Sequence, residues 1–253
     1  MAKKREVTPA RAAVELALSG DAGRALQALV SMSNDGDACA AASAAELLAF
    51  NGQWRECVEH ARRLLAEPDA VQTGNVFTDL CRLVRRAARE LGDRSIIDES
   101  AKVVPEPMRA QRDAVLLDEY VEPSSTRTPN RAKYDEAVVA ATKDKRFKGK
   151  PTQLDAHCFA LAVTFAVDDL VIARFDESNP MFHFDHAVSA ARALVKQGQS
   201  ERAWKILRSF VPRWWPVDQA QVAPVILLVD PWIAPIVTAD RAREVLTIPR
   251  GKR

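Results

Sequence analysis

The chain has 253 residues, of which 47% are hydrophobic and 28% are charged, and its formal net charge at pH 7 is +2. These values are typical of a globular protein and exclude an intrinsically disordered chain, which has fewer apolar residues and a larger net charge. The small net charge provides no general attraction for nucleic acid, so binding driven by bulk charge is excluded as well.

The N-terminal segment lacks the pattern of a signal peptide. It is basic and then apolar from Met1 to Val30, but Glu15 and Asp21 interrupt the apolar part and no small-residue cleavage site follows. The longest apolar runs, residues 159–167 and 222–229, are too short to span a bilayer. The sequence therefore predicts a cytoplasmic protein that does not associate with membranes.

Apolar residues recur at three- and four-residue steps along much of the chain, which predicts amphipathic helices. The clearest segments are residues 54–65, 77–91, 187–195 and 203–210. Thr8-Pro9 and Thr128-Pro129 each place a capping hydroxyl before a proline at the first helical position, and Thr238 precedes the last expected helix. No alternating apolar and polar run is long enough for a sheet, so we predict an all-α fold.

Prolines and serines between Glu122 and Asn130 mark a seam in the helical pattern. We therefore expect an N-terminal helical lobe over residues 1–121, a linker over residues 122–130 and a C-terminal helical lobe over residues 131–253. A second irregular stretch, from Asp176 to Met181, lies within the C-terminal lobe.

An internal repeat is the most informative feature of the sequence. In the segment Gly52–Pro68 a glycine is followed five residues later by a small residue, then by an apolar stripe and a final proline. The frame recurs from Gly20 and from Gly198. The glycine permits a sharp reversal between two helices, and the small residue lets the second helix pack closely on the first. The repeat therefore predicts antiparallel helix pairs.

The segment Gly52–Pro68 resembles the turn and second helix of a tetratricopeptide repeat, and the segments that begin at Gly20 and Gly198 are similar. The first helices lack the family's tryptophan and leucine-glycine pattern, and the glycine spacing departs from the family period. The resemblance implies an irregular tetratricopeptide-like α-solenoid. It also implies a concave groove for a peptide, lined by parts of 41–50, 77–91 and 183–195.

The four cysteines and four histidines fall at no established metal-ligand spacing. His183 and His186 would share a helical face near Asp185, but a metal needs further ligands at fixed geometry. We therefore predict no metal, no cofactor and no catalytic residue, since glycine-rich phosphate loops and a nucleophile elbow are absent as well. A metal-dependent enzyme built on His157, His183 and His186 is the alternative from a different class.

Six residues are the candidate partner-binding set, because exposed aromatic side chains beside an arginine contribute strongly to interfaces. They are Arg213, Trp214, Trp215, Trp232, His183 and His186. The tryptophans have a second interpretation, in which they cover the last helices as the cap of a helical stack.

A protein partner is the prediction that follows from a helical-repeat fold without catalytic motifs. The C-terminal part, with Trp214-Trp215-Pro216 and the segment Thr238–Gly251, resembles the ends of bacterial helical proteins encoded beside secreted toxins. That resemblance implies an immunity protein that neutralises a cognate toxin by direct binding. The alternative is an adaptor or secretion chaperone that binds peptides in the groove. Nucleic-acid binding through Lys143–Lys150 is not expected, because Phe147 is the only aromatic residue there.

Overall fold

The computed structural model describes residues 8–67, 74–117 and 128–251, and throughout these ranges the fold is built from helices without a β-strand. The predicted all-α class is therefore confirmed. None of the described helices has a stretch long and apolar enough to cross a membrane.

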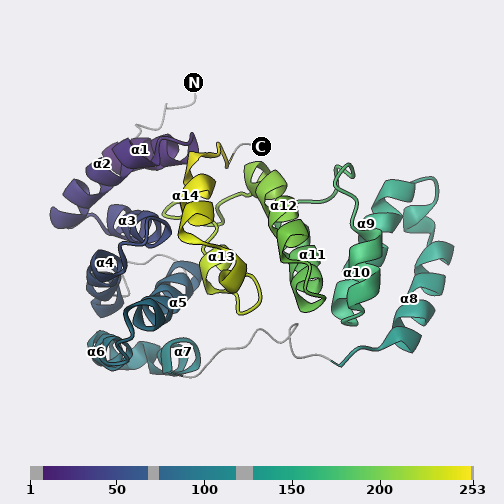
Figure 1. Ribbon diagram of the computed structural model, residues 1–253, viewed down its shortest axis with the longest axis horizontal. Coiled ribbons are helices and arrows are strands. Elements are labelled where there is room, and N and C mark those ends of the chain that lie inside the picture. The colour runs from purple at the N-terminus through teal and green to yellow at the C-terminus, as the bar shows by residue number, and fades with distance from the viewer. Residues whose placement is uncertain (1–7, 68–73, 118–127, 252–253) are drawn as a thin grey trace. The chain divides into compact units, whose positions relative to one another are not determined.

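The chain divides into two compact units (Figure 1). The first contains Met1–Tyr120, Trp215–Asp230 and Val237–Arg253, and the second contains Val121–Trp214 and Pro231–Ile236. The expected C-terminal lobe of residues 131–253 is therefore not one unit, because residues 215–230 and 237–253 belong to the first unit. Of the expected linker, residues 122–127 lie outside the described ranges.

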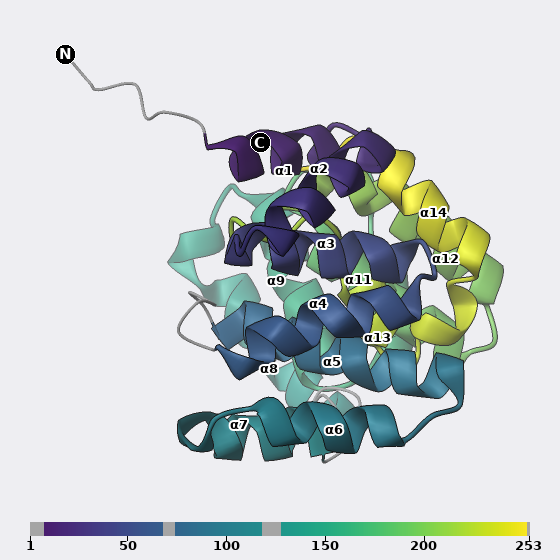
Figure 2. The same ribbon diagram turned by 90° about the vertical axis from the view of Figure 1, so that its left-hand side faces the viewer.

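The first unit begins with six helices, each packed against the next (Figure 2). They are α1 (Pro9–Leu18), α2 (Ala22–Asn34), α3 (Ala38–Phe50), α4 (Trp54–Ala66), α5 (Gly74–Leu91) and α6 (Ser95–Val103). Short helical turns follow at Glu106–Met108, Arg109–Arg112 and Asp113–Leu117. Gly20 and Gly52 take positive φ values of 100° and 78° at the reversals from α1 to α2 and from α3 to α4, as the repeat predicts.

Helix α3 is the core of the first unit. Every residue from Ala40 to Phe50 is at most 4% exposed, and the helix contacts α1, α2, α4, α5 and α14. Its sequence is rich in alanine, so neighbouring helices can approach it closely on all sides. A helix that is apolar around its whole circumference is expected to be buried in this way.

The last residues of the chain complete the first unit. Helix α13 (Ile226–Val229) packs on α5, and α14 (Ala239–Thr247) packs on α3 (Figure 1). Beyond α14, the N–H of Arg250 donates to the carbonyl oxygen of Leu18 in α1 over 2.8 Å. Residues 41–50, which the resemblance placed along a groove, are therefore buried rather than exposed. The prediction of an open groove at this helix is wrong.

The second unit contains α8 (Arg131–Lys143), α9 (Pro151–Thr164), α10 (Asp168–Arg174), α11 (Phe184–Lys196) and α12 (Ser200–Phe210). Each of these helices packs against the next in the chain. Short 3₁₀ turns lie at Lys145–Phe147, Val211–Arg213 and Ala234–Ile236. Gly198, with φ 77°, makes the reversal from α11 to α12, so the third glycine of the repeat has the predicted role.

Candidate functional site

The structure brings together three of the six predicted partner-binding residues. Arg213, in the 3₁₀ turn that follows α12, contacts the residue before His183, and His183 and His186 lie at the start of α11. Trp232 lies near the other end of α11, with its ring 5.6 Å from the Lys196 Nζ. The helix between these two groups is about 18 Å long. Trp232 and the histidines therefore do not form one site.

The two neighbouring tryptophans fall on opposite sides of the unit boundary. Trp214 is half-buried and belongs to the second unit, whereas Trp215 is exposed and belongs to the first. The six candidates are thus spread over several places, and the set around Arg213 is the one that the fold assembles.

Arg213 is the best-defined polar group of this set. Its Nη1 donates to the carbonyl oxygen of Phe182 and its Nη2 to that of Glu177, both over 3.2 Å. The guanidinium carbon lies 4.4 Å from the ring centroid of Phe210. Within the described ranges Arg213 forms no ion pair. The orientation of this exposed guanidinium is therefore fixed, and its positive charge is not neutralised by a carboxylate.

The loop from Asp176 to His183 is held by its own polar side chains. The N–H and Oγ of Ser178 donate to Asp176 Oδ1 over 2.9 and 2.7 Å, and the N–H of Met181 donates to Asn179 Oδ1 over 2.9 Å. Asn179 Nδ2 donates to the carbonyl oxygen of Thr152 in α9 over 3.3 Å. Met181 is consequently held on an ordered loop with 46% of its surface exposed. We call residues 176–183 together with Arg213 the loop platform.

A cluster of aromatic rings supports the loop platform from below. The Phe182 ring stacks on those of Phe175 and His186, with centroids 5.4 and 5.0 Å apart, and lies 4.9 Å from Phe159. Phe175 in turn lies 5.3 Å from Phe210, the ring beneath Arg213. Because buried aromatic rings have few alternative rotamers, the cluster fixes the base of the platform.

The two histidines have different environments. Burial, together with the neighbouring His183, lowers the pKa of His186 to about 4, so His186 is neutral at physiological pH. Its Nδ1 accepts the N–H of His183 over 3.2 Å and caps α11. The His183 side chain is 57% exposed, and its Nδ1 lies 3.7 Å from Asp185 Oδ2. His186 therefore supports the fold, while His183 lies on the platform surface.

The third histidine of the metal alternative has another neighbour. The ring of His157 stacks on that of Phe147, with centroids 4.9 Å apart. Among the described residues, no three His, Cys, Asp or Glu side chains are arranged to hold a metal ion.

A second polar arrangement, in the first unit, was not anticipated from the sequence. Glu46, in the middle of α3, is 3% exposed, and its Oε2 accepts the N–H groups of Val222 and Ala223 over 2.7 and 3.0 Å. Burial raises the pKa of the Glu46 carboxyl well above its ordinary value, although the two N–H groups and Arg250 oppose the shift. The only indication of this arrangement in the sequence of α3 is a single glutamate among alanines and leucines.

Other side chains of α3 and α5 hold the same stretch of backbone. Ser43 Oγ donates to the carbonyl oxygen of Ala220 over 2.6 Å, and Gln221 Nε2 donates to Asp79 Oδ2 over 2.9 Å. Gln221 Oε1 also accepts the N–H of Val217. We call residues 217–223 the clasp segment, because Ser43 and Glu46 of α3 bind its main chain and Asp79 of α5 binds its Gln221 side chain.

Arg250, near the end of the chain, links the clasp segment to α14. It is 1% exposed, and its Nε donates to the carbonyl oxygen of Val222 over 2.7 Å. Its Nη1 donates to the carbonyls of Val245, Leu246 and Ile248 at the end of α14. Burial lowers the pKa of Arg250 to about 10, so the guanidinium remains charged at neutral pH and stabilises the C-terminal end of the helix.

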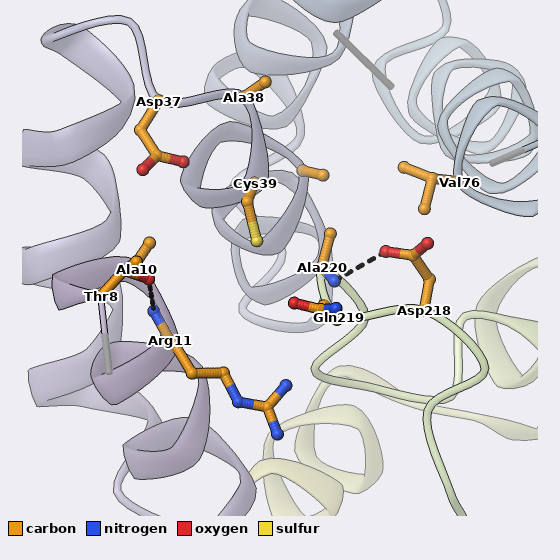
Figure 3. A pocket seen from close by; sticks show the side chains of 11 residues that line it. Thr8, Ala10, Arg11, Asp37, Ala38, Cys39, Val76, Asp218, Gln219 and Ala220 are labelled. Carbon is orange, nitrogen blue, oxygen red and sulfur yellow. Dashed lines mark hydrogen bonds between the residues drawn. The ribbon is translucent and has the colours of Figure 1, made fainter. Parts of the chain in front are cut away.

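A pocket of about 320 Å³ lies between α1, α3, α5 and the clasp segment (Figure 3). Its carboxylates already have partners: Asp37 Oδ1 accepts the N–H of Ala40, and Asp218 Oδ1 accepts that of Ala220. Burial, Asp37 and Asp218 raise the pKa of the Cys39 thiol to about 11. The thiol is therefore protonated at neutral pH and is not an activated nucleophile.

One buried pair has the residue types of a catalytic dyad. Ser33 Oγ lies 2.7 Å from His60 Nδ1, and burial lowers the pKa of His60. Both side chains are buried between α2 and α4, where solvent and substrate do not reach them. The pair therefore forms a buried hydrogen bond that joins α2 to α4.

No family model, curated protein or solved structure matches this chain. The arguments about its function therefore depend on the geometry described above.

Proposed function

We propose that this protein binds another protein through the loop platform, and that its role is to neutralise a secreted bacterial toxin by direct binding. The observation that carries the proposal is Arg213, which is exposed, fixed in orientation and without a carboxylate partner among the described residues. Met181 is exposed on the same loop. Arginine and methionine are enriched in interfaces, and a side chain that is already ordered loses less entropy on binding.

The state of the buried polar groups supports binding rather than catalysis. Burial raises the pKa of Cys57 and Cys81 to about 12, so these thiols are protonated, like that of Cys39. Glu46 is engaged with backbone N–H groups, and His60 is buried against Ser33. These five buried or half-buried groups of the described residues therefore contribute to the fold.

We also propose that the three helix pairs of the first unit form a tetratricopeptide-like stack. The support is the packing of α1 with α2, α3 with α4 and α5 with α6, together with the glycine reversals. In this stack the clasp segment, α13 and α14 cover α3 and α5. The adaptor alternative needs an open groove along α3 and α5, and these covering residues would have to move away to expose it. The platform is exposed already and is therefore the better-supported binding surface.

Coexpression with the toxin encoded by an adjacent gene tests the proposed function. We expect the wild-type protein to restore growth and the variant Arg213→Glu/Met181→Asp to fail, with affinity reduced about 30-fold or more, as for central interface residues. The matched control is Lys205→Glu/Val139→Asp, which changes an exposed lysine and an exposed valine of the same unit. Circular dichroism shows whether both variants are folded. Growth that is no better with the wild-type protein contradicts the toxin role. Full rescue by the platform variant contradicts the platform.

A further inference from the structure

The turn between α8 and α9 is a strongly basic exposed segment of the second unit. Its four lysines, Lys143, Lys145, Lys148 and Lys150, are exposed, and their ammonium groups have no ion pair or hydrogen bond with any described residue. The carboxylate of the turn, Asp144, is already paired with Arg146 over 2.6 Å. We call residues 143–150 the basic turn.

The basic turn is ordered. Asp144 Oδ1 accepts the N–H of Arg146 and its Oδ2 accepts the Nε, both over 2.8 Å. The N–H of Phe147 donates to the carbonyl of Asp144, and that of Lys150 donates to the carbonyl of Phe147. The Phe147 ring stacks on His157 of α9. The four lysines therefore extend from fixed backbone positions on one short turn, where like charges repel one another.

The basic turn adjoins the loop platform. Thr152, two residues after Lys150, accepts the hydrogen bond from Asn179 of the platform loop. The α8–α9 turn and the α10–α11 loop lie at the same end of the helices of this unit (Figure 1). The platform loop, which carries Met181, is thus joined at Thr152 to the helix that begins directly after the four lysines.

We infer that the partner presents an acidic protein surface, with carboxylates facing the basic turn and an apolar side chain packed on Met181. This inference rests on the proposed function, because it names the chemistry of the partner at the same site. Repulsion between lysines raises the free energy of the free protein, and a complementary acidic surface removes that repulsion on binding.

The surroundings of the turn favour a protein over a nucleic acid. Phe147 is already stacked on His157 and has the Arg146 guanidinium carbon 5.8 Å from its centroid, so its ring is not open for base stacking. Exposed carboxylates of Glu177 and Asp185 lie on or beside the platform. They would repel a continuous phosphate backbone, whereas a protein surface can place basic residues opposite them.

The test uses the full chain and two probes with equal numbers of negative charges, an oligoglutamate peptide and a single-stranded oligonucleotide. The variant is Lys145→Gln/Lys148→Gln/Lys150→Gln. The matched control is Lys102→Gln/Lys133→Gln/Lys205→Gln, which removes the same charge from exposed lysines elsewhere. At low salt we expect the turn variant to bind the peptide about tenfold more weakly than the wild type, and the control to change by less than about threefold. We also expect the melting temperature of the turn variant to rise, because repulsion is removed.

Equal losses in the two variants would show attraction to net charge alone and overturn the inference. Tighter binding of the oligonucleotide that depends on the turn would identify a nucleic-acid surface instead. A lower melting temperature of the turn variant would show that the lysines stabilise the fold, and would also overturn it. The titration needs no toxin, so failure of the coexpression assay and failure of this inference are separate results.

Discussion

Replacement of Glu46 tests whether the clasp segment holds the first unit together. In Glu46→Ala the buried N–H groups of Val222 and Ala223 lose their acceptor. An unsatisfied buried group costs about 1–3 kcal/mol, so two cost about 2–6 kcal/mol. Removal of a buried carboxylate offsets part of this cost. We expect the free energy of unfolding to fall by about 3 kcal/mol at neutral pH.

The variant Glu46→Gln separates the hydrogen bonds from the charge. The glutamine Oε1 can accept both N–H groups without burying a charge, so its stability should lie within about 1 kcal/mol of the wild type. The raised pKa of Glu46 adds a pH dependence. Its stabilising contribution is fully present below the ordinary value of 4.5 and is lost as pH rises through the folded-state value. The wild type should therefore lose stability relative to Glu46→Gln as pH rises above 4.5.

Urea unfolding of the wild type and both variants across this pH range measures these differences, with the exposed Glu59→Gln as the matched control. If Glu46→Gln is as damaging as Glu46→Ala at the upper end of this pH range, the charge itself is required. An ion pair with Arg250 would then dominate, and our account of the clasp would be wrong. A wild type that gains stability over Glu46→Gln with rising pH would contradict the sign of the pKa shift.

Three further predictions concern Gly20, Arg250 and the four cysteines. Gly20→Ala should lower the free energy of unfolding by about 2–3 kcal/mol, because φ is 100° and a Cβ would lie 2.7 Å from the Thr247 carbonyl oxygen. Gly52→Ala, where a Cβ would meet no atom within 4 Å, should lower it by about 1 kcal/mol. Urea unfolding measures both variants, and equal losses would contradict the close approach at Gly20. Arg250→Ala removes the donor to the Val222 carbonyl, whose peptide group carries the Ala223 N–H. It should destabilise the unit by about 3 kcal/mol and accelerate hydrogen exchange at the Ala223 amide, and unchanged stability and exchange would refute its role. Iodoacetamide at pH 7 should leave all four thiols of the native protein largely unmodified and label them after denaturation, and rapid native labelling of Cys39 would contradict its raised pKa of about 11.

The features predicted correctly from the sequence are those determined by residues close in the chain. Helical periodicity and the Thr8 cap depend on neighbours within a few positions, and the Thr8 Oγ1 does accept the N–H of Arg11. The reversals at Gly20, Gly52 and Gly198 are local as well, since each requires only a residue that tolerates positive φ. These signals were sufficient for the all-α class and the helix pairs.

The return of the C-terminal residues to the first unit has no local signal. Glu46 binds the N–H of Val222, 176 positions away, and Ser43 binds the carbonyl of Ala220, 177 positions away. Nothing in the spacing of either segment indicates the other. The same is true of the partner-binding set, because the grouping of Arg213 with His183 depends on hydrogen bonds to the platform loop. The sequence could identify these residue types but not which of them would meet.

The clasp and the platform differ in how their charges are compensated. Glu46 and Arg250 are buried, and each is hydrogen-bonded to backbone groups of its own unit, so replacing them should change the stability of the fold. Arg213 and the lysines of the basic turn are exposed and have no carboxylate partner among the described residues. Hydrogen bonds to loop carbonyls and the Phe210 ring hold the Arg213 guanidinium, and the lysines extend from a turn whose backbone is held by its own hydrogen bonds. Exposed positive charges without a carboxylate partner remain available to an acidic surface, and for this reason we propose that the partner binds the second unit.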